Sequence, residues 1–234
     1  MRLDDPELVR RDYADECRLS ARIAAQQSGT GPDPRQVAFE AVAEATPRRV
    51  LEVGPGRGEL AGRISNELGS EVVAVDQSER MVQLTLARGV EAMVGDVQKL
   101  PFGDGVFDVA VAAWMLYHVP DLDRGLRELR RVIDPGGRLV AVTNSVHSQR
   151  ELWELIGYQP RYSFGAENGE EALLRHFTIV ERREVHGTIT FPDRDAAHRY
   201  VAASPMAARL ADNLPFFDGP LICSRHVVVF VAQP

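Results

Sequence analysis

The sequence predicts an α/β fold, a doubly wound sheet of seven mostly parallel strands that is capped by helical excursions. Between residues 48 and 144, short β-branched runs alternate with stretches whose apolar residues recur at helical spacing. Strands that are separated by helices form right-handed βαβ units, and such units build a parallel sheet. The chain has 234 residues, of which 44 % are hydrophobic, and this is enough for the core of such a domain.

Two helices are expected ahead of the first strand. Residues 5–27 have an amphipathic, charged pattern, and the Gly-Thr-Gly-Pro stretch at 29–32 ends that helix. A second helix is expected from about 33 to 45. In this prediction residues 1–45 form an N-terminal helical cap, and residues 46–234 form the sheet domain.

The sheet domain begins with a regular alternation of strands and helices. Ser78 and Asp121 are expected to cap two of the helices, because short polar side chains accept hydrogen bonds from the free amides at helix starts. The strand at 106–113 is apolar throughout, which is typical of a strand that is covered on both faces. The expected strands are 48–53, 71–76, 90–94, 106–113 and 138–144, and the expected helices are 58–68, 78–88 and 121–133.

After the fifth strand the alternation becomes less regular. Residues 145–176 and 192–220 are expected to be excursions that cap the open edge of the sheet, together with the N-terminal helices. The second excursion has a helical pattern from 193 to 213 that is broken at Pro205. Two further strands, which complete the seven, are expected at 177–185 and 223–233.

Charge and composition argue against several classes of function. The formal net charge is −7, whereas wide contact with a nucleic-acid backbone requires clustered cations. The N-terminus is too charged for a signal peptide, and no apolar run approaches the roughly twenty residues that cross a bilayer. Cys17 and Cys223 are far apart and outside any metal-binding spacing. We therefore expect a cytoplasmic protein that binds neither nucleic acid nor a membrane.

Arginine supplies every basic residue of the chain except Lys99. One interpretation is bidentate recognition of phosphates or carboxylates, for which the guanidinium is suited. The other is GC-rich coding in a bacterium, which the abundant alanine also suggests. The second interpretation is preferred, because the arginines are scattered along the chain rather than clustered.

A glycine-rich turn follows the first strand, with Gly54, Gly56 and Gly58 placed just after Glu52. Glycine permits a tight turn and close approach of the backbone to a ligand, and the next helix directs its N-terminal amides toward that ligand. The second strand ends at Asp76, 22 residues after Gly54, where a carboxylate accepts hydrogen bonds from both ribose hydroxyls. Together these features predict a site for a nucleoside that carries an anionic group.

The spacing of the glycines distinguishes between cofactors. A dinucleotide site has the pattern GxGxxG, whereas this chain has GxGxG and carries Glu59 in the place of the third glycine. At this point VLEVGPGRGEL and EVVAVDQSERMV resemble the first two motifs of the class I S-adenosylmethionine-dependent methyltransferases. The resemblance is to the small-molecule group that includes the ubiquinone/menaquinone-biosynthesis enzymes.

Two further segments carry the same resemblance. GDVQKLPFGDGVFDVAVA at 95–112 is similar to the third-strand turn and fourth strand of the family, and LRELRRVIDPGGRLVAVT at 126–143 is similar to its fifth-strand segment. Asp134 departs from the pattern, since a basic residue more often precedes the Pro-Gly-Gly turn. The resemblance covers roughly residues 45–145 and implies a Rossmann-like fold with S-adenosylmethionine as the cofactor.

The resemblance also implies roles for residues that match the motifs. Glu52 and the backbone of Gly54 and Gly56 would hold the methionine moiety. Asp76 would bind the ribose hydroxyls, with Gln77 beside the adenine. The alternative for Asp76 is that it only caps the helix that begins near Ser78.

The remaining implied contacts come from the third and fourth strands. Asp96 would accept from the adenine amino group, and Val97 would donate its backbone amide to the ring. Ala113 and Trp114, at the end of the fourth strand, would lie under the sulfonium arm. The alternative for Asp96 is that it starts a turn, where aspartate is common.

His118 is the candidate general base, because it follows the fourth strand and has a near-neutral pKa as a free side chain. The alternative is a structural histidine that is hydrogen-bonded to a loop carbonyl. The other histidines have no partner at metal-ligand spacing along the chain, so no metal site is expected; they are His147, His176, His186, His198 and His226.

These observations predict an enzyme that transfers a methyl group from S-adenosylmethionine to O, N or C of a small molecule, in natural-product or quinone-like biosynthesis. Nucleic-acid amine methyltransferases usually carry Asp/Asn-Pro-Pro-Tyr/Phe after the fourth strand, and this chain has Ala112-Ala113-Trp114-Met115 there. Two alternatives remain open. One is a nicotinamide-dependent oxidoreductase, and the other is a non-catalytic cofactor-binding protein.

Overall fold

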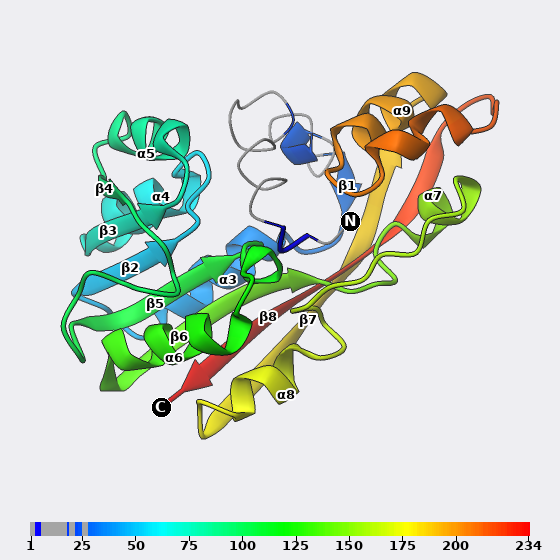
Figure 1. The fold of residues 1–234 in the computed structure, drawn as a ribbon. Coiled ribbons are helices and arrows are strands. Elements are labelled where there is room, and N and C mark those ends of the chain that lie inside the picture. The colour runs from blue at the N-terminus through cyan, green and yellow to red at the C-terminus, as the bar shows by residue number, and fades with distance from the viewer. Residues whose placement is uncertain (1–2, 6–17, 19–21, 25–27) are drawn as a thin grey trace.

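The computed structural model describes residues 3–5, 18, 22–24 and 28–234, which form one eight-stranded sheet with helices on both faces (Figure 1). The expected helix over 5–27 lies largely outside the described residues. The strand order is β1-β7-β8-β6-β5-β2-β3-β4. The strands are β1 (Gly29–Thr30), β2 (Arg49–Val53), β3 (Glu71–Asp76), β4 (Glu91–Val94), β5 (Phe107–Ala113), β6 (Ile133–Asn144), β7 (Ile179–Phe191) and β8 (Leu221–Gln233).

The described helices follow the alternation that the sequence predicts. They are α3 (Pro34–Ala43), α4 (Glu59–Leu68), α5 (Glu79–Leu86), α6 (Leu122–Val132), α7 (Arg150–Leu155), α8 (Gly169–Leu174) and α9 (Arg194–Ala203), with the 3-10 helices η1 (Leu116–His118) and η2 (Ala208–Asn213). Ser78 and Asp121 cap helices as predicted. The Ser78 hydroxyl accepts from the Met81 amide at 3.4 Å, and the Asp121 carboxylate accepts from the Arg124 amide at 3.0 Å.

Strands β2 to β6 are parallel to one another and form the doubly wound half of the sheet. The chain proceeds from β2 outward to β3 and β4, then returns to place β5 on the other side of β2. In open α/β sheets, ligands bind beyond the carboxyl ends of the strands where the strand order reverses in this way. The fold class that the sequence predicts is confirmed, and the reversal between β2 and β5 indicates where the site lies.

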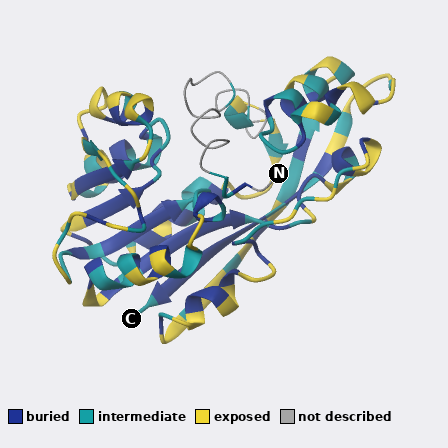
Figure 2. Ribbon diagram, viewed as in Figure 1, coloured by how far each residue is buried: buried dark blue, intermediate teal, exposed yellow. Residues whose placement is uncertain are grey.

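Two apolar layers cover the faces of this half-sheet. Helices α3 and α4 contribute Phe39 and Ile64 to one layer, and α6 contributes Leu126 and Leu129 to the other. Strand β5 supplies buried residues to both layers, as its continuous apolar sequence predicts. Figure 2 shows the strands as the most continuously buried part of the ribbon. This rigid core holds the carboxyl ends of β2, β3 and β5 in place.

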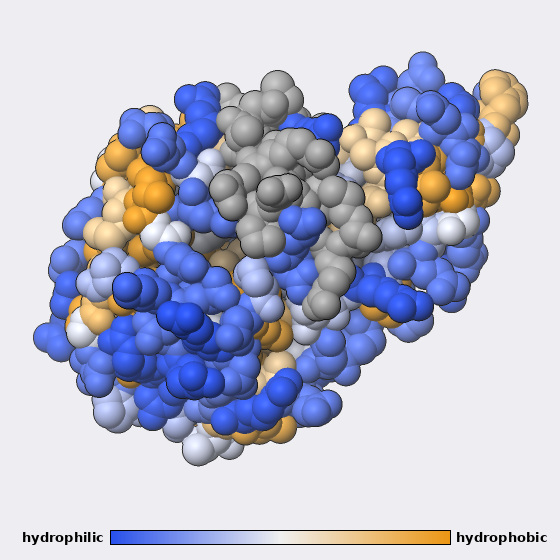
Figure 3. All heavy atoms as spheres, viewed as in Figure 1, coloured by the Kyte–Doolittle hydropathy of each residue, from blue (hydrophilic) through white to orange (hydrophobic). Residues whose placement is uncertain are grey.

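The outer surface of α6 is polar. Hydrophilic side chains predominate over this helix in Figure 3, and Arg127 and Arg131 form ion pairs there with Asp123 and Glu128. These arginines therefore belong to a solvated, charge-paired surface. Among the described residues, no helix is both long enough and apolar enough to traverse a bilayer.

The antiparallel half of the sheet extends past the carboxyl end of β6. Asn144, the last residue of β6, pairs with Val227, so residues 221–226 of β8 continue beyond it alongside the second half of β7. Helices α7, α9 and η2 pack on this extension around buried Trp153, Phe191 and Tyr200. In Figure 1 the extension rises opposite α4 and α5. The two halves of the sheet therefore face each other across the carboxyl ends of the parallel strands.

The structure differs from the sequence-based expectation in the number and length of these edge strands. The Gly-Thr-Gly-Pro stretch, interpreted as a turn, also contains the eighth strand, because Gly29 and Thr30 pair with Ile189 and Thr188 of β7. Strand β7 runs to Phe191 rather than ending near residue 185, since the long β8 continues to pair with it. Both features depend on partners far away in the chain. The predicted break at Pro205 is confirmed, because α9 ends at Ala203 and η2 begins at Ala208.

Candidate functional site

A cavity of about 880 Å³ lies at the carboxyl ends of β2, β3 and β5. Its volume is near the upper end of the roughly 300–1,000 Å³ that is usual for ligand pockets. The structure brings all ten sequence-predicted site residues to its wall: Glu52, Gly54, Gly56, Asp76, Gln77, Asp96, Val97, Ala113, Trp114 and His118. Residues that are far apart along the chain thus line the same cavity, at the point where the strand order reverses.

The turn between β2 and α4 depends on its glycines. Gly54, Gly56 and Gly58 all have left-handed backbone, with φ of 65°, 56° and 71°. A Cβ atom on Gly54 would lie 2.7 Å from the Cβ of Met115, and one on Gly58 would lie 2.8 Å from Oγ1 of Thr85. Larger residues would therefore be strained in conformation and would also collide with neighbours. The small residues keep the backbone close to the cavity.

Glu52 is a buried acid without a complete set of partners. Its side chain is 2 % exposed, and its Oε2 atom has no hydrogen-bond partner among the described residues. Burial raises the pKa of this carboxyl to about 8, the backbone N–H of Ala61 lowers it in part, and the charge of Asp76 raises it. A buried carboxylate at a cavity wall fits a ligand that brings a cation or hydrogen-bond donors.

Asp76 ends β3 and faces the same cavity. Burial raises the pKa of its carboxyl to about 6, although the backbone N–H groups of Ser78, Gly56 and Gln77 stabilise the ionised form. Its Oδ1 accepts from the Ser78 amide at 2.9 Å. Ser78 itself caps α5, so this bond fixes the carboxylate in a local turn rather than providing the helix cap. A carboxylate that is oriented in this way fits the paired hydroxyls of a ribose.

Asp96 adopts the turn that was the alternative interpretation of its sequence position. Its Oδ1 accepts from the Gln98 amide at 2.8 Å, and its carboxylate also accepts from Nε2 of the same side chain. The residue nevertheless lines the cavity, and so does its neighbour Val97. The structure therefore places Asp96 both in a turn and at the site.

Trp114 holds an uncommon conformation at the end of β5, next to Ala113. Its φ is 54°, and such left-handed backbone in a residue other than glycine costs on the order of 1–3 kcal/mol. Two contacts hold it in place. Its amide donates to the Val142 carbonyl at 2.9 Å, and its indole Nε1 donates to the Asn144 side chain at 3.1 Å. Strain that is maintained by its surroundings is typical of functional sites.

His118 lies in η1 with 9 % of its surface exposed and lines the cavity. Its Nδ1 is 2.9 Å from the carbonyl oxygen of Leu3. Because a carbonyl oxygen only accepts, Nδ1 carries the proton, and the neutral ring has its lone pair on Nε2. The ring makes a T-shaped contact with Tyr117, with the ring centroids 4.6 Å apart. His118 thus makes the hydrogen bond to a backbone carbonyl that is expected of a structural histidine. The resulting tautomer is also the one that a base acting through Nε2 requires.

Several lining residues could not be identified from the sequence. Asn144, Tyr200 and Arg225 complete the wall together with Gly29 and Gly31. Asn144 ends β6, whereas the other residues belong to α9, β8 and the segment around β1, which the long antiparallel extension brings to the site. The sequence around Gly29 and Gly31 indicates only a turn. The common signal is the unusual length of the last strand, which carries β1 and α9 past the end of the parallel sheet.

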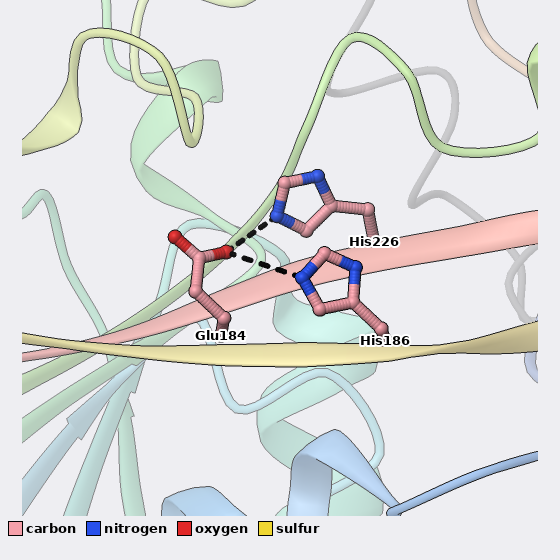
Figure 4. Close-up of side chains that lie close together, drawn as sticks. All are labelled: Glu184, His186 and His226. Carbon is pink, nitrogen blue, oxygen red and sulfur yellow. Dashed lines mark hydrogen bonds and ion pairs between the residues drawn. The ribbon is translucent and has the colours of Figure 1, made fainter.

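Two of the histidines without a partner at ligand spacing along the chain, His186 and His226, lie close to each other and to Glu184 in the structure. They are cross-strand neighbours on β7 and β8 with stacked rings, and Glu184 lies beside them (Figure 4). Candidate ligand atoms of the three residues lie within 4.8 Å of one another. The Glu184 carboxylate is already bonded to Arg182 and His226, and none of the three ligand-type residues lines the cavity.

Comparisons with known proteins bear on this site. A family model described as a methyltransferase domain matches residues 51–141, which include the glycine-rich turn, Asp76 and Asp96. An uncharacterized methyltransferase of Mycobacterium tuberculosis is 30 % identical over 202 residues, which cover 82 % of this chain and 80 % of that protein. The similarity thus extends well beyond the segment that the family model matches.

A demethylmenaquinone methyltransferase of Mycolicibacterium vanbaalenii is 40 % identical over 110 residues. That match covers 45 % of this chain and only 46 % of the relative's length. Among solved structures, a phosphoethanolamine N-methyltransferase of Haemonchus contortus has a TM-score of 0.65 at 16 % identity, covering 100 % of this chain and 61 % of that one. At that identity the likeness describes the fold.

Proposed function

The chain belongs to the class I S-adenosylmethionine-dependent methyltransferases, and on that premise we propose that it transfers the methyl group of S-adenosylmethionine to O, N or C of a small-molecule acceptor. The observation that supports this proposal is a cavity of about 880 Å³ that the glycine-rich turn, the strand-end acids and His118 line together. The acceptor belongs, in this proposal, to natural-product or quinone-like biosynthesis. The demethylmenaquinone methyltransferases among its relatives favour the quinone-like class.

The proposed cofactor contacts follow from the geometry of the wall. Glu52 has an unpartnered carboxylate oxygen for the methionine moiety, next to the backbone of Gly54 and Gly56. Asp76 would accept from the ribose hydroxyls. The remaining proposed contacts are Gln77, Asp96 and Val97 to the adenine, and Ala113 and Trp114 beneath the sulfonium arm.

When it is bound, the cofactor supplies a methyl group that its sulfonium already activates. The protein then has to orient the acceptor behind that methyl and exclude water, and such positioning contributes several kcal/mol to catalysis. For an acceptor that must lose a proton, we propose His118 as the base. Nε2 would take the proton, while the bond from Nδ1 to the Leu3 carbonyl holds the ring in the required tautomer.

We further propose that the acceptor is not a nucleic acid and that the enzyme acts in the cytoplasm. The net charge of −7 disfavours binding to a polyanion. The segment after β5 lacks the Pro-Pro-aromatic sequence that is usual in methyltransferases of nucleic-acid bases.

Ligand binding and turnover together test the proposal. We expect S-adenosylhomocysteine to raise the melting temperature of the protein, by the equivalent of about 2.7 kcal/mol at a hundredfold excess over Kd, while NAD(H) leaves it unchanged. Stabilisation by NAD(H) alone would favour the oxidoreductase alternative. If the protein binds S-adenosylhomocysteine but releases none from S-adenosylmethionine with a diverse set of acceptors, the non-catalytic alternative replaces the enzymatic one.

A further inference from the structure

The wall of the cavity that is built from β1, β8 and α9 contains a buried arginine. Arg225 lies on β8 opposite Gly187 of β7 and is 5 % exposed. It lines the same chamber as Gly29, Gly31 and Tyr200. No role proposed above for cofactor binding or proton transfer uses this side chain.

The hydrogen bonds of Arg225 leave most of its donors unused. A guanidinium has five N–H donors. Nη2 donates to the carbonyls of Thr30 and Pro32 at 3.0 and 2.7 Å. Nε is buried, and no described residue accepts a hydrogen bond from it. Nη1 likewise makes no hydrogen bond to any described residue. Three donors on two nitrogens therefore remain unused, and those of Nη1 are the ones that are not buried.

The charge of Arg225 is also unbalanced. Across the described residues it takes part in no ion pair, whereas arginines 131, 138, 182 and 183 are all paired with carboxylates. Carbonyl dipoles orient a guanidinium but do not neutralise it, and burying a cation without an anion is costly. The side chain is held in position at the cavity wall, and its counter-charge is missing.

Two glycines make room for this guanidinium. A Cβ atom on Gly187 would lie 2.8 Å from Nη2, and one on Gly29 would lie 3.3 Å from Nη1. The segment before α3 supplies the two carbonyls that fix the planar group. The arginine therefore occupies a fitted position over Gly187 and Gly29, unlike a flexible surface side chain.

Building on the proposed methyltransferase function, we propose that Arg225 binds an oxyanion of the methyl acceptor, either a carboxylate or a phosphate. The planar guanidinium fork suits both groups, and charge-assisted hydrogen bonds to them are about twice as strong as neutral ones. The same cavity is lined by Trp114, Tyr117 and Tyr200, whose rings fit an apolar or aromatic body. The acceptor is thus an anionic small molecule, and its charged group determines how it is oriented toward the cofactor.

Binding of simple probes to the 234-residue chain tests this inference. Calorimetry at constant ionic strength would compare benzoate, phenyl phosphate and the uncharged methyl benzoate, each with and without saturating S-adenosylhomocysteine. We expect at least one anion to bind about tenfold or more tightly than methyl benzoate. A difference between benzoate and phenyl phosphate identifies which oxyanion the site prefers.

Three variants separate the charge of Arg225 from its structural contacts. R225Q removes the charge but keeps N–H donors on a shorter side chain, and we expect it to lose the preference for anions. R225K keeps the charge and should retain the preference at reduced affinity. R194M is the matched control, because Arg194 also donates to two backbone carbonyls, those of Leu214 and Pro215, but lies outside the cavity wall.

Three outcomes would overturn the inference. They are wild-type protein that binds neither anion, equal binding of methyl benzoate and the anions, and R225Q with wild-type preference for anions. Failure of the proposed function is recognised separately, since S-adenosylhomocysteine binding is measured in the same titrations. Loss of cofactor binding with intact, Arg225-dependent anion binding would remove the methyltransferase proposal and leave an oxyanion site.

Discussion

Glu52 is the side chain whose protonation most directly links the cofactor site to the stability of the protein. Its carboxyl has an ordinary pKa of 4.5 in the unfolded chain, and burial raises it to about 8 in the folded, ligand-free protein. Between these values the unfolded chain is ionised while the folded one keeps its proton. The free energy of unfolding therefore decreases as pH rises from about 4.5 to 8, and the stability from the neutral carboxyl is fully present only below that window.

Replacing Glu52 with glutamine should stabilise the ligand-free protein and weaken cofactor binding. Glutamine resembles the neutral carboxyl, so the gain in unfolding free energy should be larger at pH 8 than at pH 5.5 and on the order of 1–4 kcal/mol at pH 8. Denaturant titrations at the two pH values would measure it. A gain that does not depend on pH would contradict the raised pKa.

Replacing Asp76 with alanine should weaken S-adenosylhomocysteine binding by about 1–3 kcal/mol, because a charged acceptor for two hydroxyls is lost. Wild-type affinity should also weaken as pH falls below about 6, where this carboxyl becomes protonated in the ligand-free protein. Calorimetry would measure both effects. E171A, at an exposed position on α8, is the control. Unchanged affinity of the Asp76 variant would mean that the ribose lies elsewhere.

Replacing His118 with asparagine separates its two interpretations. Asparagine can still donate to the Leu3 carbonyl, so the fold and the affinity for S-adenosylhomocysteine should be nearly unchanged. If Nε2 acts as the base, kcat should fall by roughly 10²-fold or more, with loss of the acidic limb of the pH profile. A variant with the full rate would assign the histidine to packing alone.

Among the elements, the turn between β2 and α4 is the one whose backbone conformation depends most directly on glycine. Gly58 precedes α4 in left-handed backbone and packs against Thr85 of α5, so the turn fixes how the two helices meet. Gly69, at the other end of α4, has nearly the same backbone, with φ of 68°, but nothing within 4 Å of where a Cβ would be. The two glycines differ mainly in their surroundings.

This difference gives a matched pair of variants. G69A should lose about 1 kcal/mol of unfolding free energy from backbone strain and keep its affinity for S-adenosylhomocysteine. G58A should lose more stability and also bind the cofactor less tightly, because its Cβ would lie 2.9 Å from the Thr85 Cα. Denaturant titration and calorimetry would measure both variants. Equal behaviour of the two would show that the contact with α5 does not shape the turn.

How far an element can be predicted from sequence depends on the distance to its partners. Strands β2 to β6 carry their signal locally, in apolar runs, glycine turns and caps such as Ser78. Their bounds lie within one residue of those expected, except that β6 begins at Ile133 rather than at 138 and includes the expected Pro-Gly-Gly turn. Strand β1 has two residues and exists only because β7 pairs with it from about 160 residues away. Arg225 and Tyr200 escaped detection for the same reason, since their place at the cavity depends on that long-range pairing.

At the scale of the whole molecule, the negative net charge disfavours binding to polyanions. Folding adds little to this argument, because Arg127 and Arg131 of α6 are paired with carboxylates of the same helix. A net charge of −7 repels a polyanion at low salt, where attraction to a basic protein would be strongest.

We therefore expect no binding to a DNA duplex or to structured RNA at about 50 mM salt, and no retention on heparin. Electrophoretic mobility shift with fluorescent oligonucleotides would measure this, with a basic DNA-binding protein as the positive control. Binding that weakens steeply as salt increases would reveal a local cationic surface and would contradict the assignment of a small-molecule acceptor.

Because β1 pairs with β7, two different parts of the fold line the cavity. The parallel core supplies every residue assigned to the cofactor, whereas the segment around β1 and the projecting end of β8 supply Gly29, Gly31 and Arg225. Substitutions in this second group should therefore alter which acceptor is bound while the proposed cofactor contacts remain intact. The two specificities of the enzyme, for donor and for acceptor, are then separable by mutation at opposite sides of the cavity.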